Sequence, residues 1–428
     1  MKLAAIFLLL ALAMTLTSAA TVIYKENFYI EPQQVLSASD LAGNYSIAQK
    51  LTPGRDSDVV IWGTSKDANN NYWLSRRLIY GENFTANGSD VAMNTSFPEA
   101  PQIATIVDHA NSPTGILYRQ TFNGNQSIIL LIINAEEPNY FQNVTIESGN
   151  STSTYPEIRI SATPQNQFLV YYTKTTNGLT SQIYAQIIVS ATGSTGFLFN
   201  RLMSVSGSNL VVSSPSCDFL DMNNTYMCTW HQDNGDSTAD WMLGRYDLYG
   251  TVLTGSPGKL WTNDYTGVNE TLNVYVQTTA NLISIIGENA TAGSVVAYFT
   301  YQMDEPTVLA EPNTTLSITN NTVSWSDRYA NGIFIGYQVS FSSNTTVIEK
   351  YIRYNQLGYS IGPELIIAVD GSVVTTARTG NDSLVVGVLT DTNELYVGAL
   401  AYSISSAVRN MVACSLSIFL IVILVFGF

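Results

Sequence analysis

Cysteine, histidine and charged residues are scarce in this chain of 428 residues. It has three cysteines and two histidines, and charged side chains make up 12% of it. So few cysteines exclude a small scaffold held together by disulfides, and two histidines leave little for a metal site of several imidazoles. Basic residues number 18 against 33 acidic ones, and the net charge of −15 gives no electrostatic basis for nucleic-acid binding.

Apolar and β-forming residues are abundant instead. Hydrophobic residues make up 46% of the chain, which supplies a core and excludes wholesale disorder. Short runs rich in Val, Ile, Tyr, Phe and Thr, such as 168–174, 182–189 and 384–389, are bounded by Gly, Asn, Asp, Ser or Pro. Long helical periodicity is absent between the two ends, so the sequence predicts an all-β protein.

The amino-terminal end has the pattern of a secretion signal. Lys2 precedes an apolar run over residues 4–16, and the small residues Ser18, Ala19 and Ala20 follow it. This order predicts a signal peptide over residues 1–20, cleaved before Thr21; a retained amino-terminal anchor is the alternative.

The carboxyl-terminal end predicts a glycosylphosphatidylinositol (GPI) anchor. The small residues Ser403 and Ser405 begin an attachment region and spacer over residues 403–414, and residues 415–428 form an apolar tail with no charged residue after it. Small site, spacer and terminal tail are the signal for lipid attachment, which we place at Ser405 or Ser403. The alternative is a retained transmembrane segment, because the 18 apolar residues 411–428 are near the lower length limit for crossing a bilayer.

Asn-x-Ser/Thr sequons support an outward-facing chain. Fourteen are present, at Asn44, Asn83, Asn87, Asn94, Asn125, Asn143, Asn150, Asn223, Asn269, Asn289, Asn313, Asn320, Asn344 and Asn381. Together with the two ends, they predict an N-glycosylated protein at the extracellular face of the plasma membrane, with the membrane as a partner through the anchor.

The cysteines agree with an oxidising compartment. Cys414 lies in the spacer and leaves with the tail when the anchor is added, which leaves Cys217 and Cys228. Their spacing suits two strands joined by a loop, and we expect them to form a disulfide. Two unpaired buried thiols are the alternative.

An internal repeat indicates the architecture. Arg245-Tyr246-Asp247, followed by Gly250, recurs 108 positions later as Arg353-Tyr354-Asn355, followed by Gly358. Weaker relatives end at Gly81 and Gly193. The intervals between these glycines correspond to one or two periods of about 55 residues, which is typical of propeller blades or repeat arrays.

Closure of the repeats into a ring follows from the exposure of a single unit. A lone four-stranded sheet has two exposed faces and two edges, and radial stacking buries the faces. Residues 21–405 hold seven units of about 55 residues, so we predict a single β-propeller over residues 21–402 with seven four-stranded blades; six or eight blades are the alternatives. The segment 22–36 is expected to complete the last blade beside residues 395–402. Two β-sandwiches would explain the strands but not the repeated motif.

The repeat resembles a known type. An apolar strand, a loop and a strand ending in Gly-Arg-Tyr-Asp, clearest over residues 226–255, are similar to the repeats of large propeller-type cell-surface proteins. The resemblance covers about half of the chain between the two ends and implies a propeller on a cell surface, without identifying an enzyme family.

The richest polar cluster is the segment 229–241. We expect a polar turn with solvated carboxylates here and no bound metal; the alternative is a calcium site with Asp233, Asp236 and Asp240 as oxygen ligands, although their spacing is not that of an EF-hand. Trp230 and Trp241 flank the cluster, and filling the space between blades is their expected role. No other metal or cofactor is indicated.

The chemistry-bearing residues form no coherent catalytic set, so we expect a non-enzymatic protein for recognition, adhesion or surface-coat formation. An extracellular carbohydrate-active hydrolase is the alternative, and it requires paired carboxylates at the channel of the propeller. Acidic residues at plausible strand or loop ends are Asp58, Asp108, Asp221, Asp304, Glu305 and Asp327.

Overall fold

The computed structural model describes part of the chain between residues 21 and 400. The described ranges are 21–54, 58–106, 113–134, 142–163, 166–178, 180–191, 194–202, 211–220, 225–233, 239–247, 251–252, 258–263, 282–289, 293–300, 314–318, 321–329, 332–340, 346–355, 361–379 and 383–400. Two short helices, η1 (Lys25–Asn27) and α2 (Ala38–Ala42), occur in these ranges, and all other regular elements there are strands.

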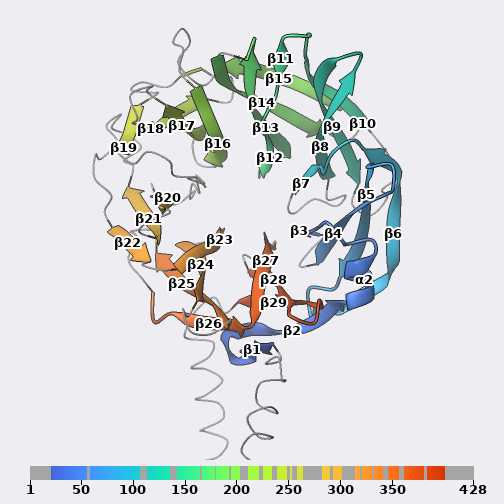
Figure 1. Ribbon diagram of the computed structural model, residues 1–428, viewed down its shortest axis with the longest axis vertical. Helices are drawn as coiled ribbons and strands as arrows, with labels where there is room; N and C mark the ends of the chain where they lie inside the picture. Colours follow the sequence, from blue (N-terminus) through green and yellow to red (C-terminus); the bar gives the residue numbers. More distant parts are fainter. Residues whose placement is uncertain are drawn as a thin grey trace, which may run out of the picture.

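The described strands form seven antiparallel sheets, which follow one another along the chain and stand around a central axis (Figure 1). We number the sheets blade 1 to blade 7 and give the strands of each from the centre outward. Blade 1 contains β3 (Ala48–Pro53), β4 (Val59–Lys66), β5 (Tyr72–Ile79) and β6 (Ala86–Phe97); blade 2 contains β7 (Gln102–Thr105), β8 (Pro113–Phe122), β9 (Asn125–Asn134) and β10 (Gln142–Ser148). Blade 3 contains β12 (Ile158–Thr163), β13 (Gln167–Thr176), β14 (Thr180–Ala191) and β15 (Ser194–Leu202), with β11 (Ser153–Thr154) also paired to β13.

The remaining blades repeat this arrangement. Blade 4 contains β16 (Val211–Leu220), β17 (Thr225–Asp233), β18 (Ala239–Asp247) and β19 (Gly258–Asn263), and the described part of blade 5 contains β20 (Leu282–Asn289), β21 (Gly293–Thr300) and β22 (Thr314–Ile318). Blade 6 contains β23 (Asn321–Tyr329), β24 (Gly332–Ser340), β25 (Val347–Asn355) and β26 (Leu365–Val369); blade 7 contains β27 (Gly371–Arg378), β28 (Leu384–Thr390) and β29 (Leu395–Leu400). The prediction of a seven-bladed propeller is confirmed.

The ring is closed by the amino-terminal segment. Strand β2 (Phe28–Leu36) pairs with β29 as the outermost strand of blade 7, as predicted. Strand β1 (Val22–Ile23) differs from the prediction, because it pairs with β26 and extends blade 6. The η1 turn separates the two strands, and the Asn27 side chain donates to the Ile366 carbonyl across 2.8 Å. The first strands of the ring therefore pair with its last two blades, β1 with blade 6 and β2 with blade 7.

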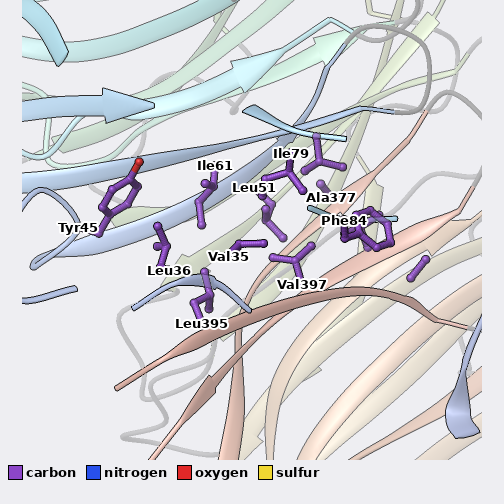
Figure 2. Packing of buried hydrophobic residues seen from close by; sticks show 13 residues of the cluster. Val35, Leu36, Tyr45, Leu51, Ile61, Ile79, Phe84, Ala377, Leu395 and Val397 are labelled. Atoms are coloured by element: carbon purple, nitrogen blue, oxygen red, sulfur yellow. The ribbon is translucent and has the colours of Figure 1, made fainter. Parts of the chain in front are cut away.

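The hydrophobic core lies between blades rather than inside them. The cluster drawn in Figure 2 joins Leu51 and Ile61 of blade 1 to Val385 and Val397 of blade 7, with Val35 of β2 between them. Other clusters join blades 1 and 2, blades 2 and 3, blades 3 and 4, and blades 6 and 7. Each of these clusters stabilises a junction between neighbouring blades.

Burial on both faces explains why the middle strands are continuously apolar. In β9, Ile128 and Leu130 face blade 3, whereas Ile129 and Leu131 face blade 1. Successive side chains of a strand point to opposite faces, so a sheet covered on both sides needs apolar residues at every position. The alternation that marks a half-exposed sheet is therefore missing from these strands.

The repeated Arg-Tyr-Asp motif has a structural role in blade 4. Tyr246 is fully buried and stacks on Tyr226, with ring centroids 5.4 Å apart. Asp247 accepts a hydrogen bond from the Thr251 backbone N–H at 2.7 Å at the end of β18. In blade 4 the tyrosine of the motif therefore fills the junction with blade 3, and the aspartate lies at the end of a strand.

Aromatic rings cover glycines in several blades. A Cβ on Gly63 of β4 would lie 2.1 Å from Tyr45 Cδ1, and one on Gly336 of β24 would lie 2.0 Å from the Trp325 ring. A close approach of this kind excludes any side chain at the glycine. The pairs fix the positions of Tyr45 and Trp325 against their blades.

We predict that Gly63→Ala destabilises the protein because the new methyl group displaces the Tyr45 ring. The free energy of unfolding should fall by about 1–3 kcal/mol, the usual cost of overpacking a core. Urea denaturation followed by fluorescence measures this. Ser65→Ala on the same strand is the control, with an expected change within about 0.5 kcal/mol. Equal stability of the two variants would contradict the packing described here.

Candidate functional site

The predicted disulfide is present in blade 4. Cys217 of β16 and Cys228 of β17 lie directly opposite each other and are bonded. Both residues are buried in the cluster between blades 3 and 4. The bond joins the inner strand of the blade to its neighbour and braces the base of the polar hairpin formed by β17 and β18.

The hairpin of β17 and β18 carries the polar cluster that the sequence singled out. Its two strands pair from Thr225↔Asp247 to Asp233↔Ala239. Trp230 is fully buried against blade 3, which confirms its role in filling the space between blades. The side chain of Trp241 lies outside the described residues, as does all of Asp236.

Strand register decides which of these residues share a face. His231 is opposite Trp241, and Trp241 is opposite Trp261 of β19, so the three positions form one row across the blade. Asp233 follows His231 by two residues and belongs to the same face. Trp230 belongs to the other face, which packs on blade 3, so the row lies on the face turned toward blade 5, the next blade along the chain.

The register also bears on the calcium candidates. Asp240 is opposite Gln232, so Asp240 and Asp233 occupy opposite faces of the hairpin. In the described part of the chain, no group of three or more His, Cys, Asp or Glu residues is arranged to hold a metal ion. Because Asp236 lies outside that part, calcium binding stays the alternative to a polar turn.

His231 is a neutral hydrogen-bonding group in this face. Burial lowers the pKa of its imidazole from the ordinary value, and the carboxylates of Asp233 and Asp240 oppose this shift without cancelling it. A neutral imidazole has one donor and one acceptor nitrogen. The exposed Asp233 lies two residues further along the same face, whereas the side chains of Trp241 and Trp261 lie outside the described residues. We take His231 and Asp233, with the backbone positions of Trp241 and Trp261 in the same row, as the candidate recognition face.

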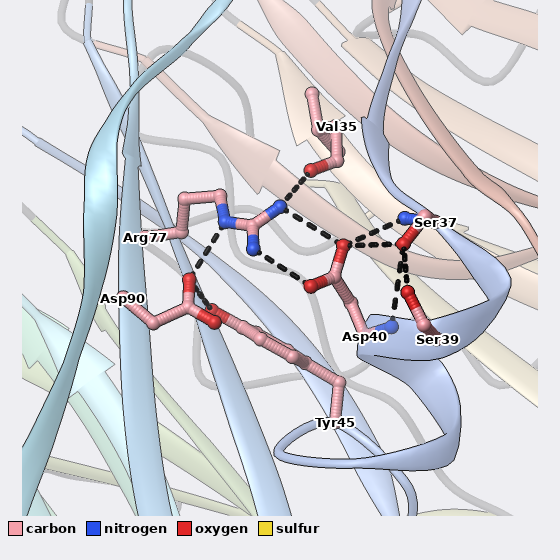
Figure 3. A network of polar contacts seen from close by, with 7 residues as sticks. All are labelled: Val35, Ser37, Ser39, Asp40, Tyr45, Arg77 and Asp90. Atoms are coloured by element: carbon pink, nitrogen blue, oxygen red, sulfur yellow. Dashed lines mark hydrogen bonds and ion pairs between the residues drawn. The ribbon is translucent and has the colours of Figure 1, made fainter.

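A second polar network, which the sequence did not reveal, lies at the junction of blades 7 and 1 (Figure 3). Arg77 of β5 donates from Nε to Asp90 Oδ1 at 2.7 Å and from Nη2 to Asp40 Oδ1 at 3.0 Å. Its Nη1 also donates to the Val35 carbonyl of β2 at 2.6 Å. One guanidinium thus links β2, α2 and β6, and we call this set the seam network.

Neighbouring groups hold the seam network in place. Ser37 and Asp40 form a capping box at the start of α2, which fixes the Asp40 carboxylate toward Arg77. Burial raises the pKa of Tyr45, and so does the carboxylate of Asp90; the phenol stays protonated and donates to Asp90 Oδ1 at 3.0 Å. Since Arg77 bonds to both carboxylates, the network serves closure of the ring rather than ligand binding.

The carboxylates that a hydrolase would need do not meet in the described residues. Asp58 accepts from the Gly81 backbone N–H at 2.9 Å and so fixes a turn in blade 1. Asp327, on the inner strand β23, accepts from the Thr376 hydroxyl of β27 at 2.7 Å. Asp108, Asp221, Asp304 and Glu305 lie outside the described residues.

The described sequon asparagines lie at the surface. Exposed members are Asn44, Asn83, Asn94, Asn125, Asn143 and Asn150. Asn87 is in β6 and Asn289 ends β20, but their side chains are not among the described ones. The other sequon asparagines lie wholly outside the described residues: Asn223, Asn269, Asn313, Asn320, Asn344 and Asn381.

The two ends of the chain, residues 1–20 and 403–428 with both anchor serines, also lie outside the described residues. Among the helices that are described, none has the length and apolar character to cross a bilayer.

We predict that Asp40→Asn weakens the seam network in a pH-dependent way. Burial raises the pKa of Asp40, but hydrogen bonds from Arg77 and Ser37 outweigh it, so the folded-state pKa lies below its ordinary value. An aspartate whose pKa is lowered by folding adds to the free energy of unfolding at every pH above its unfolded-state pKa of about 3.9. This contribution is lost as the pH falls through the lower, folded-state pKa. At pH 7 the variant should lose about 1–2 kcal/mol of unfolding free energy, and the difference should shrink below about pH 4.

Urea denaturation of both proteins at pH 7 and pH 3 measures this. Glu31→Gln is the matched control, because Glu31 pairs with Lys25 at 3.6 Å in an exposed position and should contribute under about 1 kcal/mol. A difference between wild type and Asp40→Asn that stays constant across the pH range would contradict the assignment.

Comparison with known proteins extends to the fold alone. No family model matches the chain, and no curated protein does. An ulvan lyase from a new polysaccharide lyase family superposes with a TM-score of 0.50 at 6% identity, covering 90% of this chain and 96% of the lyase. The β-propeller domain of the Trilobed protease from Pyrococcus furiosus gives 0.49 at 10% identity, with 83% and 96% covered. The six-bladed fucose-binding lectin of Aleuria aurantia gives 0.38 at 11% identity, with 75% and 97% covered.

Proposed function

We propose that this chain is a non-enzymatic, GPI-anchored and N-glycosylated propeller at the extracellular face of the plasma membrane, where it acts in recognition, adhesion or coat formation. The observation that carries the proposal is that the two ends of the ring meet in blade 7. Phe28 of β2 is paired with Leu400, the last described residue. A chain leaving after Leu400 therefore starts at the closed seam.

The ends of the ring are fixed by specific contacts. The Thr21 Oγ1 atom lies 2.6 Å from Asp391 Oδ1 and 2.6 Å from the Asp370 carbonyl oxygen, and its single O–H donates to one of the two. Thr21 is the residue expected to become the first of the mature protein. Removal of residues 1–20 leaves these contacts intact, because they belong to Thr21 itself.

The link between ring and anchor is short. Ser405 lies five positions after Leu400, and a fully extended chain covers about 18 Å at most over that interval. An anchor at Ser405 or Ser403 would hold blade 7 close to the membrane. The opposite side of the ring, where blades 3 and 4 lie, would face away from the membrane (Figure 1).

The exposed sequons fit a surface protein that must avoid self-association. Asn94 lies on β6 and Asn143 on β10, the outermost strands of blades 1 and 2. An outer strand offers unpaired backbone groups to another sheet edge, and a bulky substituent blocks such pairing. Glycans at these positions would keep neighbouring molecules apart at high surface density.

The test is release by a phosphatidylinositol-specific phospholipase. The full chain is expressed in a eukaryotic cell line, and the enzyme is expected to release the protein from intact cells. Peptide mapping should then show a lipid remnant on Ser405 or Ser403 and no peptide from residues 415–428. A variant that ends at residue 414 is the control and should be secreted without treatment.

Retention on the membrane with residues 415–428 still attached would overturn the lipid anchor in favour of a transmembrane segment. A hydrolase is the competing class. The hydrolase class would be supported if the released protein degraded a polysaccharide and the Asp327→Asn variant did not. Asp327 is the one carboxylate among the six candidates that the described residues place on an inner strand.

A further inference from the structure

The hairpin between β8 and β9 ends in a tight two-residue turn. Phe122 and Asn125 pair directly, and Asn123 and Gly124 between them have φ angles of 51° and 80°. Two consecutive positive φ values define the type I′ turn, which suits the twist of the strands and favours Asn-Gly. The turn therefore fixes the backbone positions of Phe122 and Asn125 at the tip.

Phe122 lies at this tip without the burial that the core aromatics have. It is 74% exposed, more than any other large apolar side chain of the described residues. Transferring such a ring out of water is favourable. An aromatic ring in this position is a flat apolar surface that an adjacent group could cover.

Asn125 is the residue best placed to bring such a group. It begins the sequon Asn125-Gln126-Ser127 and is exposed. Directly opposed residues in an antiparallel pair share a face, with Cβ atoms about 4.5–5.5 Å apart. A sugar attached to Asn125 Nδ2 thus starts within reach of the Phe122 ring.

We propose that the first N-acetylglucosamine of a glycan on Asn125 packs its apolar face on the ring of Phe122. The inference rests on the proposed function, because it requires passage through the glycosylation pathway. The face of a pyranose formed by C–H groups complements the negative face of an aromatic ring, and stacking removes both surfaces from water. The glycan thereby stabilises the hairpin that carries it.

A double-mutant cycle read by hydrogen–deuterium exchange tests the contact. Ser127→Ala removes the sequon and keeps Asn125, and Phe122→Ser removes the ring and keeps the sequon. In the presence of Phe122, loss of the glycan should speed exchange of the β8–β9 tip amides about 2- to 10-fold. In the Phe122→Ser background, Ser127→Ala should have no further effect.

Thr145→Ala is the matched control, because it removes the sequon at Asn143, whose cross-strand partner is the buried aliphatic Leu131. Its effect on exchange in β10 should be the same with and without Phe122. Equal and additive effects of Ser127→Ala in both Phe122 backgrounds would overturn the stacking contact.

Glycopeptide mass spectrometry separates failure of this contact from failure of the proposed function. An unmodified Asn125 in a protein that carries glycans elsewhere overturns the inference and leaves the surface glycoprotein proposal in place. A secreted chain without glycan at any sequon would overturn both.

Discussion

The pairing of β2 with β29 is the constraint on which the rest of the structure depends. A blade buries its faces only against neighbours, so an open stack of seven would leave two large apolar faces in water. Strand β2 completes blade 7 and also supplies Val35 and Leu36 to the cluster that joins blade 7 to blade 1. The same contact thus closes a sheet and seals a junction.

Directional hydrogen bonds fix the geometry of this apolar junction between blades 7 and 1. Arg77 reaches from β5 to the carbonyl of Val35 and to the carboxylate of Asp40 just after β2. Hydrophobic burial is not directional, whereas the guanidinium offers several donors in a fixed plane. The network therefore selects one position of the closing segment relative to blade 1. With the seam fixed, the amino-terminal strand β2 and the last described strand β29 lie side by side in blade 7.

The sequence predicted the architecture because repeats and strand composition are local signals. A period of about 55 residues fixed the number of blades, and the cysteine spacing indicated the disulfide. The sequence did not reveal the partners of Arg77, although Arg77 precedes one of the repeat glycines. Asp40 lies 37 positions away from Arg77, and the two side chains meet only when the ring closes. The opposite faces of Asp233 and Asp240 were equally hidden, since a shift of one residue in hairpin register would place both residues on the same face. Aromatic rings over Gly63 and Gly336 also depend on three-dimensional contacts that composition does not encode.

Ring closure is tested most directly by a cross-link between β2 and β29. Gln34 and Tyr396 lie directly opposite each other on these strands, and neither is fully buried. Cysteines at such positions have the spacing that a disulfide needs. Closure predicts that a protein carrying both Gln34→Cys and Tyr396→Cys forms the 34–396 bond after mild oxidation, with the native Cys217–Cys228 bond retained. Two thiols that both remain open to alkylation in the folded protein would show that β2 is not part of blade 7.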